Sequence, residues 1–322
     1  MMFALTVDSA KQFARDRFQK TAIVLAATSA LAWLPNLAPV AAQSKPNLPK
    51  IPIVREELTP QELTVYERAE ADLPEDYYIL YRIVELMARV NDLDDLPWRV
   101  AISTVDEESG DCINAFASQA NLIYFCKGML DRLAGDVSAV ACVVGHEMAH
   151  HQLQHIPTGV AAWDKGFEEI EKIEDEEDRQ ERIEAFIEQM EELSRTQELE
   201  ADAMGYQYAT AAGFEPEGCL RVMRVLSRLP GSLIERSHPT APARIEAIQG
   251  LIEASSSATI EVTTIDRTDN LEPLTYSWLE EEKLLRVDSD RGGSFVEDWE
   301  NRFGQNSEEG EDPVVETVST SQ

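Results

Sequence analysis

Apolar residues recur every three to four positions over long parts of the chain, which predicts a mostly helical protein. The stretch 60–91 is predicted to form two helices that break near Leu73–Pro74, because proline removes a backbone donor and ends a helix. Thr59 is a candidate N-cap for the first of them. Further helices are expected to end at Gly213 and to span 217–229, 242–254 and 278–285.

Short runs rich in β-branched and aromatic residues predict a small sheet. Strands are expected at 98–104, 112–117 and 121–126, and a further strand at 259–265. The second and third of these form a hairpin around a turn near residues 118–120. If that hairpin is symmetric, Cys112 and Cys126 face each other across it, and we expect a disulfide between them.

The most apolar helix is predicted over residues 138–151. Its first turns carry almost no polar side chain, so it should be buried nearly all round. Gly135 and Asp136 precede it as a break and a candidate N-cap. Cys142 lies on this helix and is interpreted as a small core residue.

A His-Glu-x-x-His sequence lies at the end of this helix. His146 and His150 are four residues apart and share one helix face, from which both can bind one metal ion. Glu147 projects beside them and can reach a water on that ion. A pair of surface histidines is the alternative, which a buried helix disfavours. Catalytic zinc takes three protein ligands and a water, so one ligand is still needed.

Two more histidines follow the motif. His151 lies about 100° round the helix from His150, and His155 lies one turn beyond His151. Both are therefore expected in solvent or in support of the ligands, and not on the metal. Cysteine ligands are disfavoured, because no two cysteines have the close spacing of such sites.

The stretch 163–193 is strongly acidic and has only a thin apolar stripe. We predict a charged helical hairpin with the run Glu174–Asp178 near its tip. One interpretation of this arm is a solvated surface element. The other is a lid over the metal site, because the arm connects the helix of His150 to the residues that follow.

A third ligand is expected beyond the arm. Glu198 and Asp202 are four residues apart and share a helix face. A carboxylate can bind zinc, and a second one a turn later can accept a hydrogen bond from a ligand histidine. Composition alone does not choose among Glu191, Glu192, Glu198 and Glu200.

The two motifs His146-Glu147-Met-Ala-His150 and Glu198-Leu-Glu200-Ala-Asp202 together resemble the gluzincin metallopeptidases that include HtpX, BepA and the CAAX prenyl proteases. The resemblance implies that Glu198 is the third zinc ligand and that Asp202 orients a ligand histidine. It also implies an α+β fold, mostly helical and zincin-like, with a small sheet beside the motif helix. Because a run of membrane helices and a 34-residue helical repeat are missing, the chain resembles a stand-alone exported member.

A further match is the pair His238-Pro239 and Arg244. The resemblance implies that His238 stabilises the oxyanion of the reaction, or binds zinc in a resting form. Arg244 would orient nearby carboxylates. A loop histidine before a proline is the alternative for His238. The functional interpretation is favoured because cations near a zinc site can hold developing negative charge.

Charge and composition restrict the partners. A chain of 322 residues with a formal net charge of −32 is not suited to nucleic acid or to anionic membrane surfaces. A peripheral membrane association of another kind and the oligomeric state are left open by the sequence.

The N-terminus has the pattern of an export signal, expected over residues 1–42. Basic residues precede the apolar run 21–34, and small residues suit cleavage after Ala42. An uncleaved membrane anchor is the alternative, and export to a periplasmic or envelope compartment permits disulfides. The expected remainder is a linker at 43–60, the peptidase domain at 61–254, an extension at 255–303 and a disordered acidic tail at 304–322.

The sequence therefore predicts a zinc-dependent endopeptidase with one zinc ion per chain, held by His146, His150 and Glu198. Glu147 would take a proton from the zinc-bound water and pass it to the leaving amine. The strand 121–125 is expected to pair with unfolded or extended polypeptide substrates. Quality control of exported proteins is expected by family analogy. The alternatives are a metal-bound chaperone or binding protein of the same fold, and a structural helical protein with an accidental motif.

Overall fold

A computed structural model describes residues 60–103, 112–118, 121–133, 135–229, 238–257 and 272–289. The expected export signal, the linker up to residue 59, the strand at 259–265 and the acidic tail lie outside these residues. The helices are α2 (Pro60–Asp72), α3 (Glu75–Val90), α4 (Lys127–Leu133), α5 (Val137–Gln152), α6 (His155–Glu171), α7 (Glu176–Ala211), α8 (Glu217–Leu226) and α9 (Ala241–Ser257). The strands are β1 (Trp98–Ser103), β2 (Ala115–Ser118), β3 (Leu122–Cys126), β4 (Tyr276–Leu279) and β5 (Leu284–Val287).

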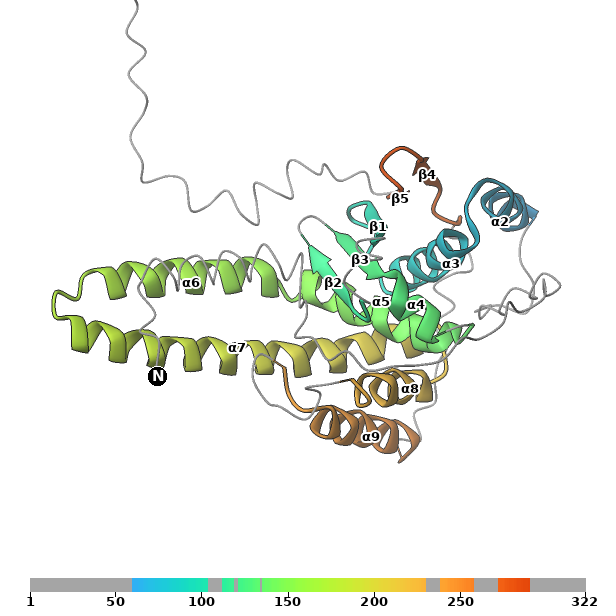
Figure 1. Ribbon diagram of the computed structural model, residues 1–322. Coiled ribbons are helices and arrows are strands. Elements are labelled where there is room, and N and C mark those ends of the chain that lie inside the picture. Colours follow the sequence, from blue (N-terminus) through green and yellow to red (C-terminus); the bar gives the residue numbers. More distant parts are fainter. Residues whose placement is uncertain are drawn as a thin grey trace, which may run out of the picture.

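Helices pack in layers around α5, which carries the His-Glu-x-x-His sequence (Figure 1). α3 and α5 contact the sheet, α7 and α8 pack against α5, and α9 packs against α7 and α8. The expected α+β fold, mostly helical with a small sheet beside the motif helix, is confirmed. None of the helices within the described ranges is both long and apolar enough to cross a lipid bilayer.

The sheet has five strands in the order β2-β3-β1-β5-β4. β1 runs parallel to β3, and the other neighbours are antiparallel. The predicted hairpin of β2 and β3 is present. However, β3 lies between β2 and β1, so the expectation that the strand 121–125 offers a free edge is wrong. In the part of the chain that the structure describes, the edge strands are β2 and β4.

The C-terminal strands replace a predicted helix. The stretch 278–285 was expected to be helical, but β4 and β5 form a hairpin there and extend the sheet. Leu285 and Val287 are fully buried on one face of β5, and Lys283 takes the positive φ of 48° that the tight turn requires. Hydrogen bonds from Tyr77 to Lys283 O and from Tyr81 to Leu274 O tie this hairpin to α3. Tertiary pairing therefore overrides local helix propensity.

The predicted N-cap of α5 is formed by Asp136. Its Oδ1 atom accepts a hydrogen bond from Ala139 N at 3.0 Å, and its carboxylate is also paired with Arg221 from α8. Burial raises the pKa of Asp136, but the hydrogen bond and charge of Arg221 outweigh burial and lower it. The cap fixes where α5 starts, and therefore which face of the helix its histidines occupy.

Two glycines allow α5 and α7 to touch at the level of the motif. A Cβ atom on Gly205 would lie 2.5 Å from His146 N, and one on Gly145 would lie 2.6 Å from Gly205 O. Both clashes involve backbone atoms, which cannot rotate away. This crossing holds the C-terminal part of α7 directly against the turn of α5 that carries His146.

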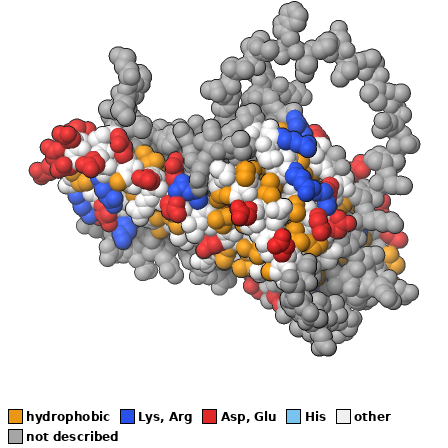
Figure 2. Space-filling model, turned by 90° about the horizontal axis from the view of Figure 1, so that it is seen from below, with side chains coloured by type: hydrophobic (Ala, Val, Ile, Leu, Met, Phe, Trp, Pro, Cys, Tyr) orange, Lys and Arg blue, Asp and Glu red, His pale blue; other side chains and the backbone are white. Residues whose placement is uncertain are grey.

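The acidic arm is a helical hairpin of α6 and α7, as the sequence predicts, and its turn spans residues 172–175. The arm has its own small core, separate from the main core, made of Trp163, Phe167, Ile170, Ile183, Phe186 and Met190. Acidic side chains gather at its tip (Figure 2), where Asp175 caps α7 through the backbone N–H groups of Glu177 and Asp178. The hairpin projects away from the sheet (Figure 1).

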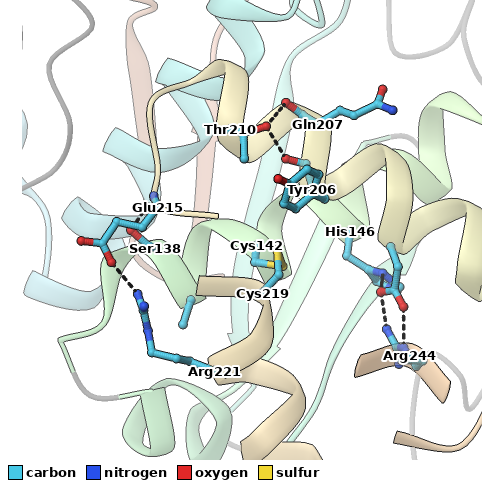
Figure 3. Close-up of a disulfide and its surroundings, with 12 residues drawn as sticks. Ser138, Cys142, His146, Tyr206, Gln207, Thr210, Glu215, Cys219, Arg221 and Arg244 are labelled. Carbon is cyan, nitrogen blue, oxygen red and sulfur yellow. Dashed lines mark hydrogen bonds and ion pairs between the residues drawn. A yellow bond between two sulfur atoms is a disulfide. The ribbon is translucent and has the colours of Figure 1, made fainter. Parts of the chain in front are cut away.

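Two disulfides join elements around α5. The expected pair Cys112–Cys126 links the start of β2 to the end of β3. Cys142 is a buried core residue as predicted, but it is also bonded to Cys219 on α8, 77 residues away in sequence, which was not predicted (Figure 3). The sequence showed only the local pairing, since the contact between α5 and α8 is made by tertiary packing.

Candidate metal centre

Three potential ligands converge between α5 and α7. His146 Nε2 lies 3.1 Å from His150 Nε2, and the Glu198 carboxylate oxygens lie 3.5 Å and 3.6 Å from those two nitrogens. All three side chains are nearly buried, with side-chain exposures of 10–15%. The structure thus brings together the three residues that the sequence predicts as metal ligands, although Glu198 lies 48 residues after His150 in the sequence.

The spacing of these atoms fits a single metal ion. Nitrogen and oxygen ligands bind first-row divalent ions at about 2.0–2.1 Å, so neighbouring ligands of a tetrahedral site lie about 3.3–3.4 Å apart. The three observed separations of 3.1–3.6 Å bracket that value. Two imidazoles and one carboxylate are also the donor set of a catalytic site that keeps a position open for water.

Asp202 and Arg244 support this cluster from the side of His146. Asp202 Oδ1 lies 3.0 Å from His146 Nδ1, the ring nitrogen that faces away from the other ligands. Arg244 donates two hydrogen bonds to the Asp202 carboxylate, at 2.6 Å and 2.7 Å, and its Nη1 lies 3.5 Å from Glu198. Burial raises the pKa of Asp202, but the charge of Arg244 outweighs burial and lowers it. Asp202 is therefore an anion that can hold His146 in one orientation.

Glu147 lies beside the ligands and is 5% exposed. Burial raises the pKa of its carboxyl to about 7, with a smaller increase from Glu198; His146 and a hydrogen bond from the backbone of Ala117 act in the opposite direction. Ala117 belongs to the edge strand β2. Glu147 therefore lies between the ligand cluster and that edge, where a general base of raised pKa can serve a reaction near neutral pH.

His238 approaches the cluster from the segment that precedes α9. Its Nδ1 atom lies 3.1 Å from Glu198 Oε2, and half of its side chain is exposed. The negative charge of Glu198 raises the pKa of His238. Burial raises the pKa of Glu198 itself, but His238 and His146 together bring it well below its ordinary value. His238 is thus a partly accessible hydrogen-bond donor at the rim of the site, and Glu198 favours its protonated form.

The pKa values of His146 and His150 shift in opposite directions. Burial lowers the pKa of His146, but Asp202 and Glu198 outweigh burial and raise it to about 10. Burial, together with the charge of His146, lowers the pKa of His150 to about 3. Asp202 and Glu198 thus stabilise positive charge at His146, whereas His150 favours its neutral form.

His151 and His155 are both buried, and neither joins the three ligands. His151 packs edge-on against the Trp98 ring and lies 3.4 Å from Leu122 O. His155 instead touches a ligand, because its Nδ1 atom lies 2.9 Å from His150 Nδ1. His155 was expected one turn beyond His151 on the same helix, but α5 ends at Gln152 and Gln154 takes a positive φ of 54°. Pro157, in the first turn of α6, is the sequence signal for that break, because a proline there cannot continue α5.

Comparison with known proteins identifies the family. Residues 77–252 match the family model described as Peptidase family M48. The chain belongs to this family. The matched range contains every ligand and supporting residue described above, and M48 peptidases depend on a metal, in agreement with the geometry of His146, His150 and Glu198. The predicted metallopeptidase class is therefore confirmed.

A curated relative agrees with this assignment. The chain is 26% identical over 162 residues to the mitochondrial metalloendopeptidase OMA1 of Arabidopsis thaliana. The aligned stretch makes up 49% of this chain and 32% of the relative, so the chain spans about a third of that protein's length. No solved structure matches the chain.

Proposed function

We propose that this M48 metallopeptidase is a zinc-dependent endopeptidase that cleaves extended polypeptide segments. The observation that carries the proposal is the convergence of His146, His150 and Glu198 at tetrahedral spacing with Glu147 beside them. His146, His150 and Glu198 would hold the ion, and two imidazoles with one carboxylate suit zinc among the common divalent metals.

The chemistry that bound zinc supplies is polarisation of the scissile carbonyl and a lowered pKa of its water. Glu147 would accept a proton from that water and donate it to the leaving amine, a role that its buried position and raised pKa support. His238 and Arg244 are cationic donors beside Glu198, where negative charge develops on the carbonyl oxygen. Asp202 would keep His146 in its ligating orientation.

The substrate would lie along β2. This strand is one edge of the sheet, it contacts α5, and Ala117 on it already hydrogen-bonds Glu147. Main-chain pairing with such an edge holds an extended peptide without requiring a particular sequence. We therefore assign to β2 the pairing with substrate that was expected for the strand 121–125.

An exported protein-quality-control role is proposed on separate grounds. Two disulfides, Cys112–Cys126 and Cys142–Cys219, suit an oxidising compartment, and the N-terminal residues have the pattern of an export signal. Recognition of unfolded chains through their backbone is consistent with such a role.

Metal content and casein cleavage, measured together on the full chain, test the proposal. The wild type should bind about one zinc ion and cleave casein. Glu147→Gln should keep the metal and lose about 10²–10⁴-fold of the rate, because only the proton carrier is removed. Glu198→Ala should lose both metal and cleavage. Glu188→Gln, an exposed position on the same helix, serves as the control.

The binding-protein alternative predicts a different result. A chaperone of the same fold would bind casein with the same affinity in the wild type and in Glu147→Gln, with no cleavage by either. A wild-type protein that takes up no stoichiometric divalent metal would refute the proposed function.

A further inference from the structure

The two ligand histidines are supported in different ways. His146 has the carboxylate of Asp202 at 3.0 Å from its outward-facing Nδ1. His150 has no carboxylate in that place among the described residues; its Nδ1 atom lies 2.9 Å from the Nδ1 atom of His155. His155 in turn places its Nε2 atom 3.2 Å from Glu200 Oε2. The second support is therefore a chain of two imidazoles that ends on a carboxylate.

We propose that His155 is a positioning residue for the metal ligand His150, and that Glu200 orients His155. This inference rests on the proposed function, because it assigns His150 Nε2 to the metal. That assignment follows the geometry, since His150 Nε2 faces both His146 Nε2 and Glu198.

The positions of the protons follow from the metal. An imidazole that binds a metal through Nε2 carries its proton on Nδ1 and must donate it. His155 Nδ1 must then be the acceptor, so the proton of His155 lies on Nε2 and is donated to Glu200. Each ring is thus fixed as one tautomer, and His150 is held with its lone pair toward the cluster.

The local backbone explains why His155 reaches this place. α5 ends at Gln152, and Gln154 adopts a left-handed conformation, which turns the chain so that α6 starts with His155. The ring then lies 5.0 Å from the His150 ring, edge to face, and is 6% exposed. Gln197 on α7 donates a hydrogen bond to His155 O at 3.5 Å. The contacts from His150 through His155 to Glu200, which we call the relay, therefore connect α5, α6 and α7 at the base of the acidic arm.

Zinc affinity of the metal-depleted full chain, measured by competition with a chromophoric chelator, tests the proposal. His155→Phe keeps a ring but removes the acceptor, and should weaken zinc binding about 10–100-fold. His155→Asn places an amide oxygen near the position of Nδ1 and should stay within about threefold of the wild type. The absorption spectrum of the cobalt-substituted protein should change in His155→Phe and be retained in His155→Asn.

Glu200 allows a second, independent measurement. Because its side chain is 56% exposed, water can replace it, and Glu200→Ala should weaken zinc binding by less than about threefold. In the His155→Phe background the same change should have no further effect, because the relay is already broken. Glu188→Ala, an exposed glutamate on the same helix, is the matched control.

Unchanged zinc affinity and an unchanged cobalt spectrum in His155→Phe would overturn the proposal, as would fully additive effects of His155→Phe and Glu200→Ala. Should His155→Phe not fold, as shown by its circular dichroism, the comparison of His155→Asn with His155→Leu carries the test in the same way. A wild-type protein without zinc binding is a separate outcome, because it refutes the proposed function itself.

Discussion

The crossing of α5 and α7 makes the metal centre sensitive to one methyl group on Gly205. In Gly205→Ala, the added Cβ atom would lie 2.5 Å from His146 N, 2.7 Å from Gly145 C and 2.8 Å from His146 Cα. Ordinary van der Waals contact begins near 3.4 Å, so the helices must move apart by nearly 1 Å at the residue that carries a ligand. No side-chain rotation relieves this clash, because the opposing atoms are backbone.

The magnitude of the effect follows from two opposing contributions. Overpacking of this kind destabilises by about 1–3 kcal/mol. Replacement of glycine by alanine within a helix stabilises the folded state by about 0.5–1 kcal/mol. The two together give a net loss of up to about 2.5 kcal/mol in unfolding free energy. A displacement of about 1 Å at a catalytic site can also reduce the rate about 10²-fold.

The assay combines thermal unfolding, metal content and peptide cleavage. The matched control is Gly250→Ala on α9, where a Cβ atom meets nothing within 4 Å, so the same substitution should stabilise by about 0.5–1 kcal/mol. If Gly205→Ala retains wild-type stability, metal and activity, α5 and α7 do not meet as described, and the reasoning fails.

Three further predictions concern the surroundings of α5. Asp136→Ala should cost about 1 kcal/mol of stability through loss of the N-cap. The pKa of Asp136 is lower in the folded state than in the unfolded state. Its contribution to stability should therefore be complete above the unfolded-state pKa of about 3.9 and be lost as pH falls through the folded-state pKa. The melting temperatures of the wild type and of Asp136→Asn should converge in acid. Changing both Cys142 and Cys219 to serine opens a loop of 77 residues and should lower the free energy of unfolding by about 2–5 kcal/mol in denaturant titrations. Equal denaturation midpoints for the oxidised and the reduced wild type would contradict this. Arg244→Met removes the arginine partner of the buried Asp202 charge and should cost about 3–5 kcal/mol and reduce metal retention. A variant that melts like the wild type would show that the pair is not formed.

Two of the three candidate ligands could be predicted from the sequence because they lie close together on one helix. His146 and His150 share a helix face by spacing alone, and the turns before them show that the helix is buried. Glu198 was chosen among several glutamates only through the family resemblance. Its position against His146 depends on the contact between Gly145 and Gly205, which a periodicity argument does not reveal.

The incorrect predictions share a physical cause, which is dependence on partners distant in sequence. The stretch 278–285 has helical propensity, yet β5 pairs with β1, almost two hundred residues earlier. Strand order likewise cannot be read from β3 alone. The disulfide of Cys142 was likewise missed, because its partner lies on α8. His155 supports His150, which is one of the two places expected for it, but its contact could not be predicted because the break formed by the left-handed Gln154 ahead of Pro157 was not recognised.

The separate small core of the arm has a consequence for the spacing between the two halves of the ligand motif. α6 and α7 hold each other through residues such as Trp163 and Phe186, which do not belong to the main core. Adding or removing the same number of whole turns in both helices, about 3.6 residues each, keeps the rotational phase of α7 where it meets α5. The length of the hairpin can therefore change while the Glu198 side chain keeps its orientation toward His146 and His150.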